Sequence, residues 1–337
     1  MNKKHIWLII PMISFVFLYE LIIYNKIPLA SDMVAHEPIK KWISSTNDFP
    51  HWFPNLFSGL PSYGGYIYTP GHPLQPLLNA IYINNGVKFW LYLSIGGVSL
   101  FFLLKFLKVS YTASLFGGIA YALTPYVFGL INAGHNNKIM AGAFTPLILL
   151  CALYMFSNRS IKSILLLSIV SALQLWTNHP QIFYYTWIVI GLWWLVGTTY
   201  RLIKNKINVK NIIKDILFLA LSVIISLLMV SDPYYDIYKF QNESNRGAIS
   251  VLDQTDDTKK GTTWDYATQW SFHPLETISF IYPYYYGLQN FSVKNKSEPR
   301  KFMKQASYWE YMPFTQSTHY LGLLIVILSF FGLWYYF

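Results

Sequence analysis

The chain has 337 residues, of which 54% are hydrophobic and only 12% are charged, and its mean hydropathy is +0.33. A soluble protein of this length could not bury so much apolar surface, so the composition excludes an ordinary soluble enzyme and predicts an integral membrane protein. The formal net charge of +10 fits attraction to lipid headgroups, and nucleic acid is not expected as a partner.

Apolar runs that could cross a bilayer as helices, at about 20 residues each, recur along the chain. The last run is still apolar at Phe337, so we expect the chain to be the N-terminal portion of a longer protein or a truncated gene product. The fold class predicted is an all-α integral membrane protein, a polytopic helical bundle in which residues 1–337 form a single transmembrane domain. The eight predicted spans cover residues 6–24, 87–107, 113–131, 139–156, 161–176, 182–200, 212–230 and 320 onward.

The first of these runs has a competing interpretation. Lys3 and Lys4 precede it and small residues follow it at 30–31, which is also the pattern of a secretory signal peptide. The run is long for a signal peptide and carries Glu20. We therefore expect an uncleaved membrane anchor.

The distribution of cations predicts the orientation of the spans. If the N-terminus is cytoplasmic, segments 1–5, 105–110, 157–162 and 201–215 are cytoplasmic too, and they carry eleven cations against the single acid Asp215. The other side then carries fourteen cations and fourteen acids. This excess of positive charge on the cytoplasmic side is the usual pattern of multi-span membrane proteins, so the N-terminus is predicted to be cytoplasmic.

Two long segments, 25–86 and 231–319, then lie on the outer side, and we expect each to form a cap of short helices and turns. Neither contains a phosphate-binding loop or a dinucleotide-binding glycine pattern. Seven of the eight histidines fall at the outer ends of spans or beyond them, His5 being the exception. The single cysteine, Cys151, lies within a span and predicts neither a disulfide nor a zinc site.

Three short outer segments concentrate groups that could do chemistry. Each also has a structural interpretation, because Asp, Asn and Gly are common in helix caps and turns, and Pro180 suits the first turn of a helix. The candidates are Asp32, His36 and Glu37 after the first span, His135, Asn136 and Lys138 between the third and fourth, and Asn178, His179 and Gln181 between the fifth and sixth.

A series of segments gives the chain a family resemblance. In order they are SDMVAH, HWFPNLFSGLPSYGG, NAGHNNKIMAGAFTPLILL, TNHPQIFYYT, ESNRGAIS, WDYATQWSFHPLETISFIYP and YWEYMPFTQSTHYLG. The series resembles the YfhO-like bacterial membrane proteins, which belong to the GT-C class of multi-span glycosyltransferases that use lipid-linked sugars. It covers essentially the whole chain. Members of this family run to roughly twice this length, with about a dozen or more spans, so we expect the C-terminal part to be missing.

The resemblance implies a fold of GT-C type in the bacterial plasma membrane, with the active face extracytoplasmic. It implies that a polyprenyl-phosphate-linked sugar entering from the membrane lipid is the donor, and that a cell-envelope glycan or lipid is the acceptor. Asp32 matches the active-site carboxylate near the start of the first outer loop. Such a carboxylate can accept the proton of an attacking sugar hydroxyl, which makes Asp32 the predicted general base.

The departing phosphate requires positive charge. Arg246 is the preferred candidate because a guanidinium matches phosphate oxygens and Gly247 leaves room for a ligand, although a cation that reaches to the headgroups explains it equally well. Lys138 and the helix N-terminus after Pro180 are alternatives. The full set of predicted substrate-binding residues is His36, Glu37, His135, Asn136, Lys138, Asn178, His179, Gln181, Arg246, Asp265, Trp270 and Glu276.

Cofactors and rival functions stay open at this point. A divalent metal ion could bind Asp32 and His36, which are four residues apart, with His135 or His179 completing the set, but no strong metal-binding pattern is present. One rival function is a transporter or flippase of lipid-linked glycans, which would favour inverted repeats and charged, broken spans. The other is a non-catalytic membrane scaffold with the same fold.

Overall fold

The structure of the chain is a computed structural model. It describes residues 3–28, 34, 37–46, 50–54, 59–62, 74–204, 206, 208–244, 264, 268, 271, 274–283, 285, 290–294, 302–306 and 320–336. Two compact units are present. The first comprises Met1–Leu123 and Gly129–Phe240, and the second comprises Thr124–Phe128 and Gln241–Phe337.

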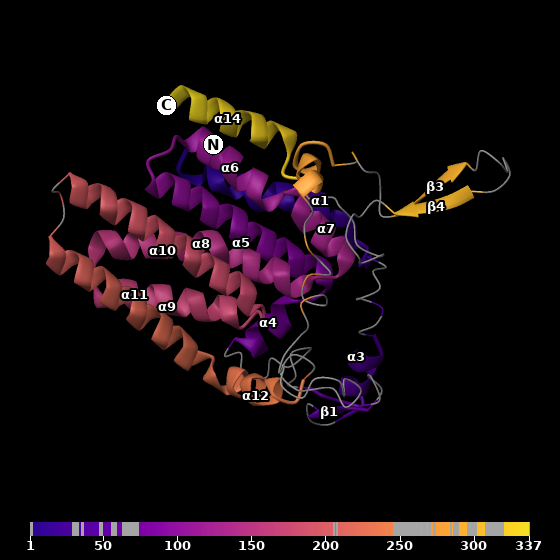
Figure 1. The fold of residues 1–337 in the computed structure, drawn as a ribbon. Coiled ribbons are helices and arrows are strands. Elements are labelled where there is room, and N and C mark those ends of the chain that lie inside the picture. The colour runs from indigo at the N-terminus through magenta and orange to yellow at the C-terminus, as the bar shows by residue number, and fades with distance from the viewer. Residues whose placement is uncertain are drawn as a thin grey trace. The chain divides into compact units, whose positions relative to one another are not determined.

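Within the described ranges, six helical stretches are long and apolar enough to cross a membrane, with 19 to 24 residues each. The chain is thus an all-α, multi-pass membrane protein by the length and composition of its helices (Figure 1). Two other predicted spans are shorter apolar helices, α9 (Ile161–Leu175) and α14 (Leu323–Tyr336). The six long stretches are η1 (Lys3–Leu8) with α1 (Ile9–Ile23), α5 (Asn85–Phe106), α6 (Tyr111–Ala122) with α7 (Pro125–Ala133), α8 (Asn136–Asn158), α10 (Pro180–Ile203) and α11 (Val209–Met229).

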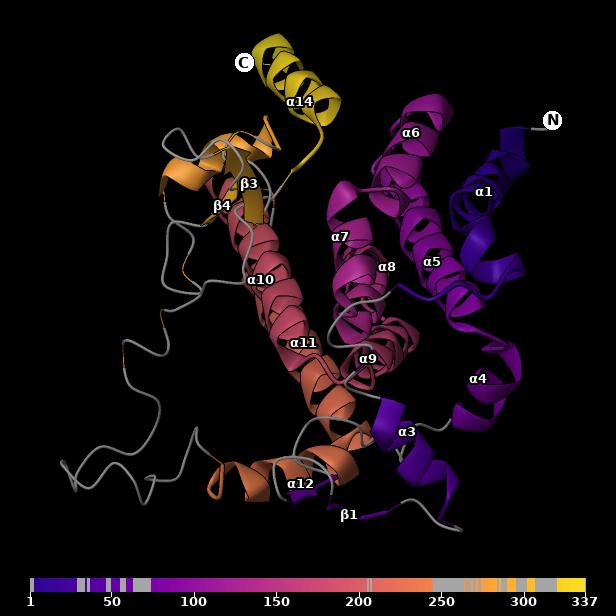
Figure 2. The ribbon, with the colours of Figure 1, turned by 90° about the vertical axis from the view of Figure 1, so that its right-hand side faces the viewer.

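Two glycines allow α1, α5 and α6 to pack closely (Figure 2). A Cβ atom at Gly97 of α5 would lie 2.7 Å from the carbonyl oxygen of Gly118 on α6 and 2.7 Å from Ile10 Cγ2 on α1. A Cβ atom at Gly118 would meet the carbonyl oxygen of Gly97, again at 2.7 Å. Small residues are the usual means by which membrane helices approach one another, because lipid gives helices no hydrophobic reason to associate.

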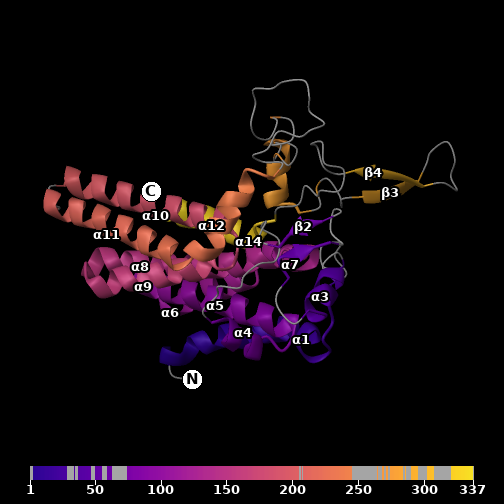
Figure 3. The same cartoon turned by 90° about the horizontal axis from the view of Figure 1, so that it is seen from below.

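Connections between helices of the first unit alternate between two ends of the bundle, and Figure 3 shows α10 and α11 joined at one of them. The histidine end carries the α7–α8 and α9–α10 turns, with His135 and His179, and the junction of α11 with α12 (Ser231–Gln241). The lysine end carries the α5–α6, α8–α9 and α10–α11 connections. Its cations are Lys105, Lys108, Arg159, Lys162, Arg201, Lys204, Lys206, Lys210 and Lys214.

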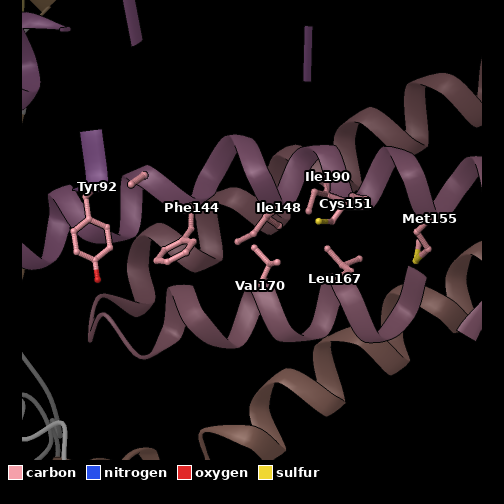
Figure 4. Packing of buried hydrophobic residues seen from close by; sticks show 10 residues of the cluster. Tyr92, Phe144, Ile148, Cys151, Met155, Leu167, Val170 and Ile190 are labelled. Atoms are coloured by element: carbon pink, nitrogen blue, oxygen red, sulfur yellow. The ribbon is translucent and has the colours of Figure 1, made fainter. Parts of the chain in front are cut away.

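A hydrophobic cluster fills the space between α5, α8, α9 and α10 (Figure 4). Ile148, Met155 and Leu167 are fully buried there, and Tyr92 packs edge-on against Phe144 with 6.0 Å between ring centroids. Cys151 belongs to this cluster as a buried free thiol. The cluster therefore fixes the relative positions of the helices that carry the histidine end.

The long segments outside the spans contain short elements. The first has α3 (Glu37–Ser44), α4 (Gln75–Ile81) and an antiparallel pair, β1 (Trp52–Phe53) with β2 (Leu60–Pro61). The second has α12, the 3-10 helix η2 (Pro274–Phe280) and a second antiparallel pair, β3 (Asn290–Lys294) with β4 (Phe302–Ala306). The sequence predicts short helices and turns here, and the two small strand pairs are additional.

Candidate functional site

The predicted catalytic residue and several predicted ligands lie outside the described residues. These are Asp32, His36, Arg246, Asp265 and Trp270, and of Glu37 only the backbone is described, as the first residue of α3. The predictions of a general base, a guanidinium on phosphate and an Asp32–His36 metal site therefore stay predictions. Among the described residues, no group of three His, Cys, Asp or Glu side chains could hold a metal ion.

The turn between α7 and α8 places three of the predicted site residues. Gly134 has a φ of +83°, a left-handed conformation that suits glycine. The backbone N–H of His135 donates to the carbonyl oxygen of Leu130 at 2.9 Å, which closes the turn. His135 is then the N-cap of α8, whose first turn holds Asn136 and Lys138 and no acidic residue, and no side chain caps the helix.

The turn between α9 and α10 has a similar construction. The Thr177 hydroxyl donates to the carbonyl oxygen of Gln174 at 2.6 Å, and Asn178 adopts a φ of +56°, a region that asparagine tolerates better than most residues. His179 is the N-cap of α10, Pro180 follows within the first turn, and no side chain caps this helix either. Two long helices therefore begin at histidines at the same end of the bundle.

Directly below these turns, Gln174 joins α8, α9 and α10. Its Nε2 atom lies 2.9 Å from the carbonyl oxygen of Ala141, 3.2 Å from Thr145 Oγ1 and 3.2 Å from Thr186 Oγ1. The two threonine hydroxyls are 3.2 Å apart. Gln174 is fully buried, and its Oε1 atom has no hydrogen-bond partner in the described part of the chain. Gln174 is not among the predicted site residues, although a glutamine inside an apolar helix is a pattern that indicates such a residue.

The two turns are close enough to interact electrostatically. The pKa of His179 is held below its usual value of 6.5, first by burial of the imidazole and then by the positive charge of Lys138, with a smaller contribution from His135. A hydrogen bond to its own backbone opposes the shift. The Nδ1 atom of His179 is buried and lacks a partner among the described residues. His179 is therefore predominantly a neutral imidazole near neutral pH.

Two other predicted residues are placed differently. Gln181 is exposed on α10, where its amide donates to the Tyr185 hydroxyl at 2.8 Å. Glu276 is fully buried in η2 of the second unit, where the Ser279 hydroxyl donates to the Glu276 carbonyl oxygen at 2.6 Å. The structure thus brings His135, Lys138 and His179 together, whereas the Gln181 amide bonds to Tyr185 and Glu276 belongs to the second unit.

Tyr234 of α12 is a second structural residue at this end that is not among the predicted site residues. Its hydroxyl donates to the carbonyl oxygen of Leu175, the last residue of α9, at 2.9 Å. Burial of the phenol raises its pKa above the usual value of 10.0. Tyr234 also packs against a small cluster that includes Trp176 and Val230. The start of the second long outer segment is therefore anchored beside the α9–α10 turn.

Comparison with protein families, with curated proteins and with solved structures finds no match to this chain. The chemistry of the site has to be inferred from its own side chains. The site, which we call the histidine-end cluster, consists of His135, Asn136, Lys138, Asn178 and His179 above Gln174. It combines an ammonium group, amides, imidazoles and the N-termini of two helices, and such a set suits a ligand that has negative charge and hydroxyl groups.

Proposed function

We propose that the protein is a membrane glycosyltransferase of GT-C type that transfers a sugar from a polyprenyl-phosphate-linked donor to a cell-envelope acceptor. In this proposal the predicted eight spans lie in a bacterial plasma membrane with the histidine end facing away from the cytoplasm. The basis is the resemblance of the sequence segments to YfhO-like proteins, together with the composition of the histidine-end cluster.

The single observation that carries the proposal is the convergence of two helix N-termini with Lys138, His135 and His179 at one end of an apolar bundle. A lipid-linked sugar phosphate has a hydrocarbon tail that can lie against the apolar helices and a polar, anionic head that can bind to such a cluster. Lys138 and the helix N-termini supply positive charge for the phosphate. The amides of Asn136 and Asn178 are suitable for sugar hydroxyls.

The proposed reaction needs one base and one stabilised leaving group. A hydroxyl oxygen of the acceptor attacks the anomeric carbon, and its proton passes to the carboxylate of Asp32. The bond between the anomeric carbon and the phosphate oxygen breaks, and its electron pair leaves with the polyprenyl phosphate. Because phosphate is already a good leaving group, positive charge near its oxygens matters more than a general acid.

The test is a pair of aspartate variants made in the full-length protein. Asp32→Asn should abolish transfer while leaving the abundance of the protein unchanged, since it removes the base and keeps the size of the side chain. Asp232→Asn is the matched control, because this exposed aspartate opens α12 at the same end of the bundle. The readout is the composition of the surface glycans, measured by mass spectrometry on cells that make each variant.

An unchanged glycan composition in cells with Asp32→Asn would refute the catalytic proposal and favour the non-catalytic scaffold. A transporter or flippase makes a different prediction. In cells with an inactive variant, loss of transport would leave the lipid-linked glycan at the cytoplasmic face of the membrane, whereas loss of transfer would leave the unused lipid-linked sugar at the outer face. Measuring on which face the lipid-linked sugar accumulates therefore separates transfer from transport.

A further inference from the structure

At the lysine end, the single acid of these segments, Asp215, forms an ion pair with Arg159. Arg159 Nε lies 2.7 Å from Asp215 Oδ1, and Arg159 Nη2 lies 3.2 Å from Asp215 Oδ2. The Asp215 side chain is 1% exposed and that of Arg159 is 23% exposed. Arg159 thus contacts both carboxylate oxygens and balances the charge of Asp215, and no lysine of the described residues pairs with Asp215.

Six lysines at this end are exposed and have no acidic partner within the described residues. In contrast, Lys105 is engaged internally, since its Nζ atom donates to the carbonyl oxygen of Val109 at 2.6 Å and lies 3.9 Å from the centre of the Tyr111 ring. The six, which we call the lysine patch, are Lys108, Lys162, Lys204, Lys206, Lys210 and Lys214.

Three lysines of the patch are close to the ion pair in sequence. Lys214 immediately precedes Asp215 on α11, and Lys210 lies one helical turn before Lys214. Like charges at this spacing repel each other in a helix. Lys162 is in the first turn of α9, three residues after Arg159, and α9 packs against α11. A shared anion between these lysines would relieve their repulsion.

The surroundings of the lysine patch are apolar and exposed. Ile161 is 66% exposed, Ile203 is 73% exposed and Val209 is 63% exposed, at the ends of α9, α10 and α11 that carry the lysines. In a membrane, exposed isoleucine and valine at the end of a spanning helix would face the hydrocarbon next to the headgroups. A ligand of this surface therefore has a negatively charged head and hydrocarbon tails.

We propose that the lysine patch binds anionic phospholipid headgroups at the membrane surface, with Lys210 and Lys214 contributing most directly. The phosphate diester oxygens accept hydrogen bonds from the ammonium groups, and the acyl chains lie against the exposed apolar residues of α10 and α11. This interaction is independent of the proposed sugar transfer, because it uses the opposite end of the bundle.

The experiment uses the full chain purified in a neutral detergent and titrated with phosphatidylglycerol or phosphatidylcholine, with bound lipid counted by native mass spectrometry. Phosphatidylglycerol should bind more tightly, and Lys210→Gln with Lys214→Gln should weaken it by about fivefold per lysine removed. The matched control, Lys26→Gln with Lys239→Gln, removes two cations at the histidine end. Lys26 pairs with Glu20 at 2.8 Å, and Lys239 lies over the Tyr235 ring. This control should leave binding unchanged.

Three further measurements in the same lipid-binding assay test the proposal. Replacing Lys210 and Lys214 by arginine should retain binding, since the charge is kept, and about 1 M salt should abolish the preference for phosphatidylglycerol. Inorganic phosphate at the same concentration should not compete, because it lacks acyl chains. The proposal is overturned by equal binding of the two lipids, by an equal loss in the control variant, or by full competition from inorganic phosphate.

Discussion

Gln174 is the buried polar side chain on which the geometry of the histidine end depends. It supports the starts of α8 and α10 from α9, through Ala141, Thr145 and Thr186. A polar side chain buried among membrane helices is costly unless it is hydrogen-bonded. The two amide hydrogens of Gln174 have three acceptors within reach, which explains how glutamine is tolerated here. The free acceptor on Oε1 leaves capacity for a water molecule or a ligand hydroxyl.

We expect Gln174→Leu to lower the free energy of unfolding by about 1–2 kcal/mol, because interhelical hydrogen bonds in membranes are individually modest. Gln181→Leu is the matched control and should have no effect, since the Gln181 amide contacts only the exposed Tyr185 hydroxyl among the described residues. Denaturation in detergent micelles measures both. Equal stability of the two variants would show that Gln174 does not hold these helices together.

His179 makes the stability of the folded chain depend on pH. Because its pKa in the folded chain lies below the usual 6.5, the unfolded chain binds a proton more readily. Stability is therefore constant well above pH 6.5 and falls as the pH drops through the window between 6.5 and the lowered pKa. Lys138→Gln removes the second cause of the shift, so the pH dependence should become smaller.

Unfolding temperatures measured between about pH 5 and pH 7.5 test this prediction. His179→Asn should remove most of the dependence, whereas His5→Asn at the opposite end should leave it as in the unmodified protein. A steeper dependence in Lys138→Gln would contradict the electrostatic contact between the two turns.

At the scale of elements, hydrophobic runs located the long apolar helices, although the run at 113–131 is divided into α6 and α7 around Leu123 and Thr124. The run at 87–107 corresponds to Asn85–Phe106, and the run at 161–176 corresponds to Ile161–Leu175. Their ends agree because the caps are local, as with Asn84, whose side chain accepts from the Val87 N–H, and Ser160, which forms a capping box with Ser163.

The features that the sequence did not predict depend on contacts between distant residues. The links from Gln174 to α8 and α10 and from Tyr234 to Leu175 join separate helices, and no local pattern specifies such pairs. The sequence did predict that the α7–α8 and α9–α10 turns share one face, and their electrostatic contact agrees with this. The role of Asp32 falls outside the described residues and stays a prediction.

The close approach of α5 and α6 gives a prediction at this scale. Gly97→Ala should destabilise the bundle by about 1–3 kcal/mol, because the new methyl group meets the backbone of Gly118, which cannot move independently of its helix. Gly142→Ala on α8 is the control, since no atom lies within 4 Å of its added Cβ, and it should be neutral or stabilising by less than about 1 kcal/mol. A loss of stability in both variants would point to a general effect of alanine rather than to helix contact.

For the whole molecule, the charge distribution determines the predicted orientation. Among the described residues, the lysine end has a strong excess of cations and one buried, paired acid, Asp215. Segments of this kind are retained in the cytoplasm, so the histidine end should face away from it. Both proposals depend on this asymmetry, since each assigns a different lipid to a different end.

Labelling of single cysteines tests the orientation. Cys151 is the only cysteine of the chain and is buried, so Cys151→Ala provides a background for Asn132→Cys at the histidine end and Lys206→Cys at the lysine end. A maleimide that cannot cross membranes should label Asn132→Cys in intact cells, and Lys206→Cys only after lysis. The reverse pattern would place the histidine-end cluster in the cytoplasm.

The most direct test of the central proposal is whether the histidine-end cluster binds a lipid-linked phosphate. The full chain is purified and titrated with a long-chain polyprenyl phosphate, and bound lipid is measured by native mass spectrometry. The titration is made in the background of Lys210→Gln with Lys214→Gln, so that the lysine patch does not take up the same anionic lipid. We predict tight binding that Lys138→Gln combined with His179→Asn weakens by about tenfold or more, since two groups of the histidine-end cluster are lost. Binding that is no tighter than that of phosphatidylcholine, or that is insensitive to Lys138 and His179, would contradict the account.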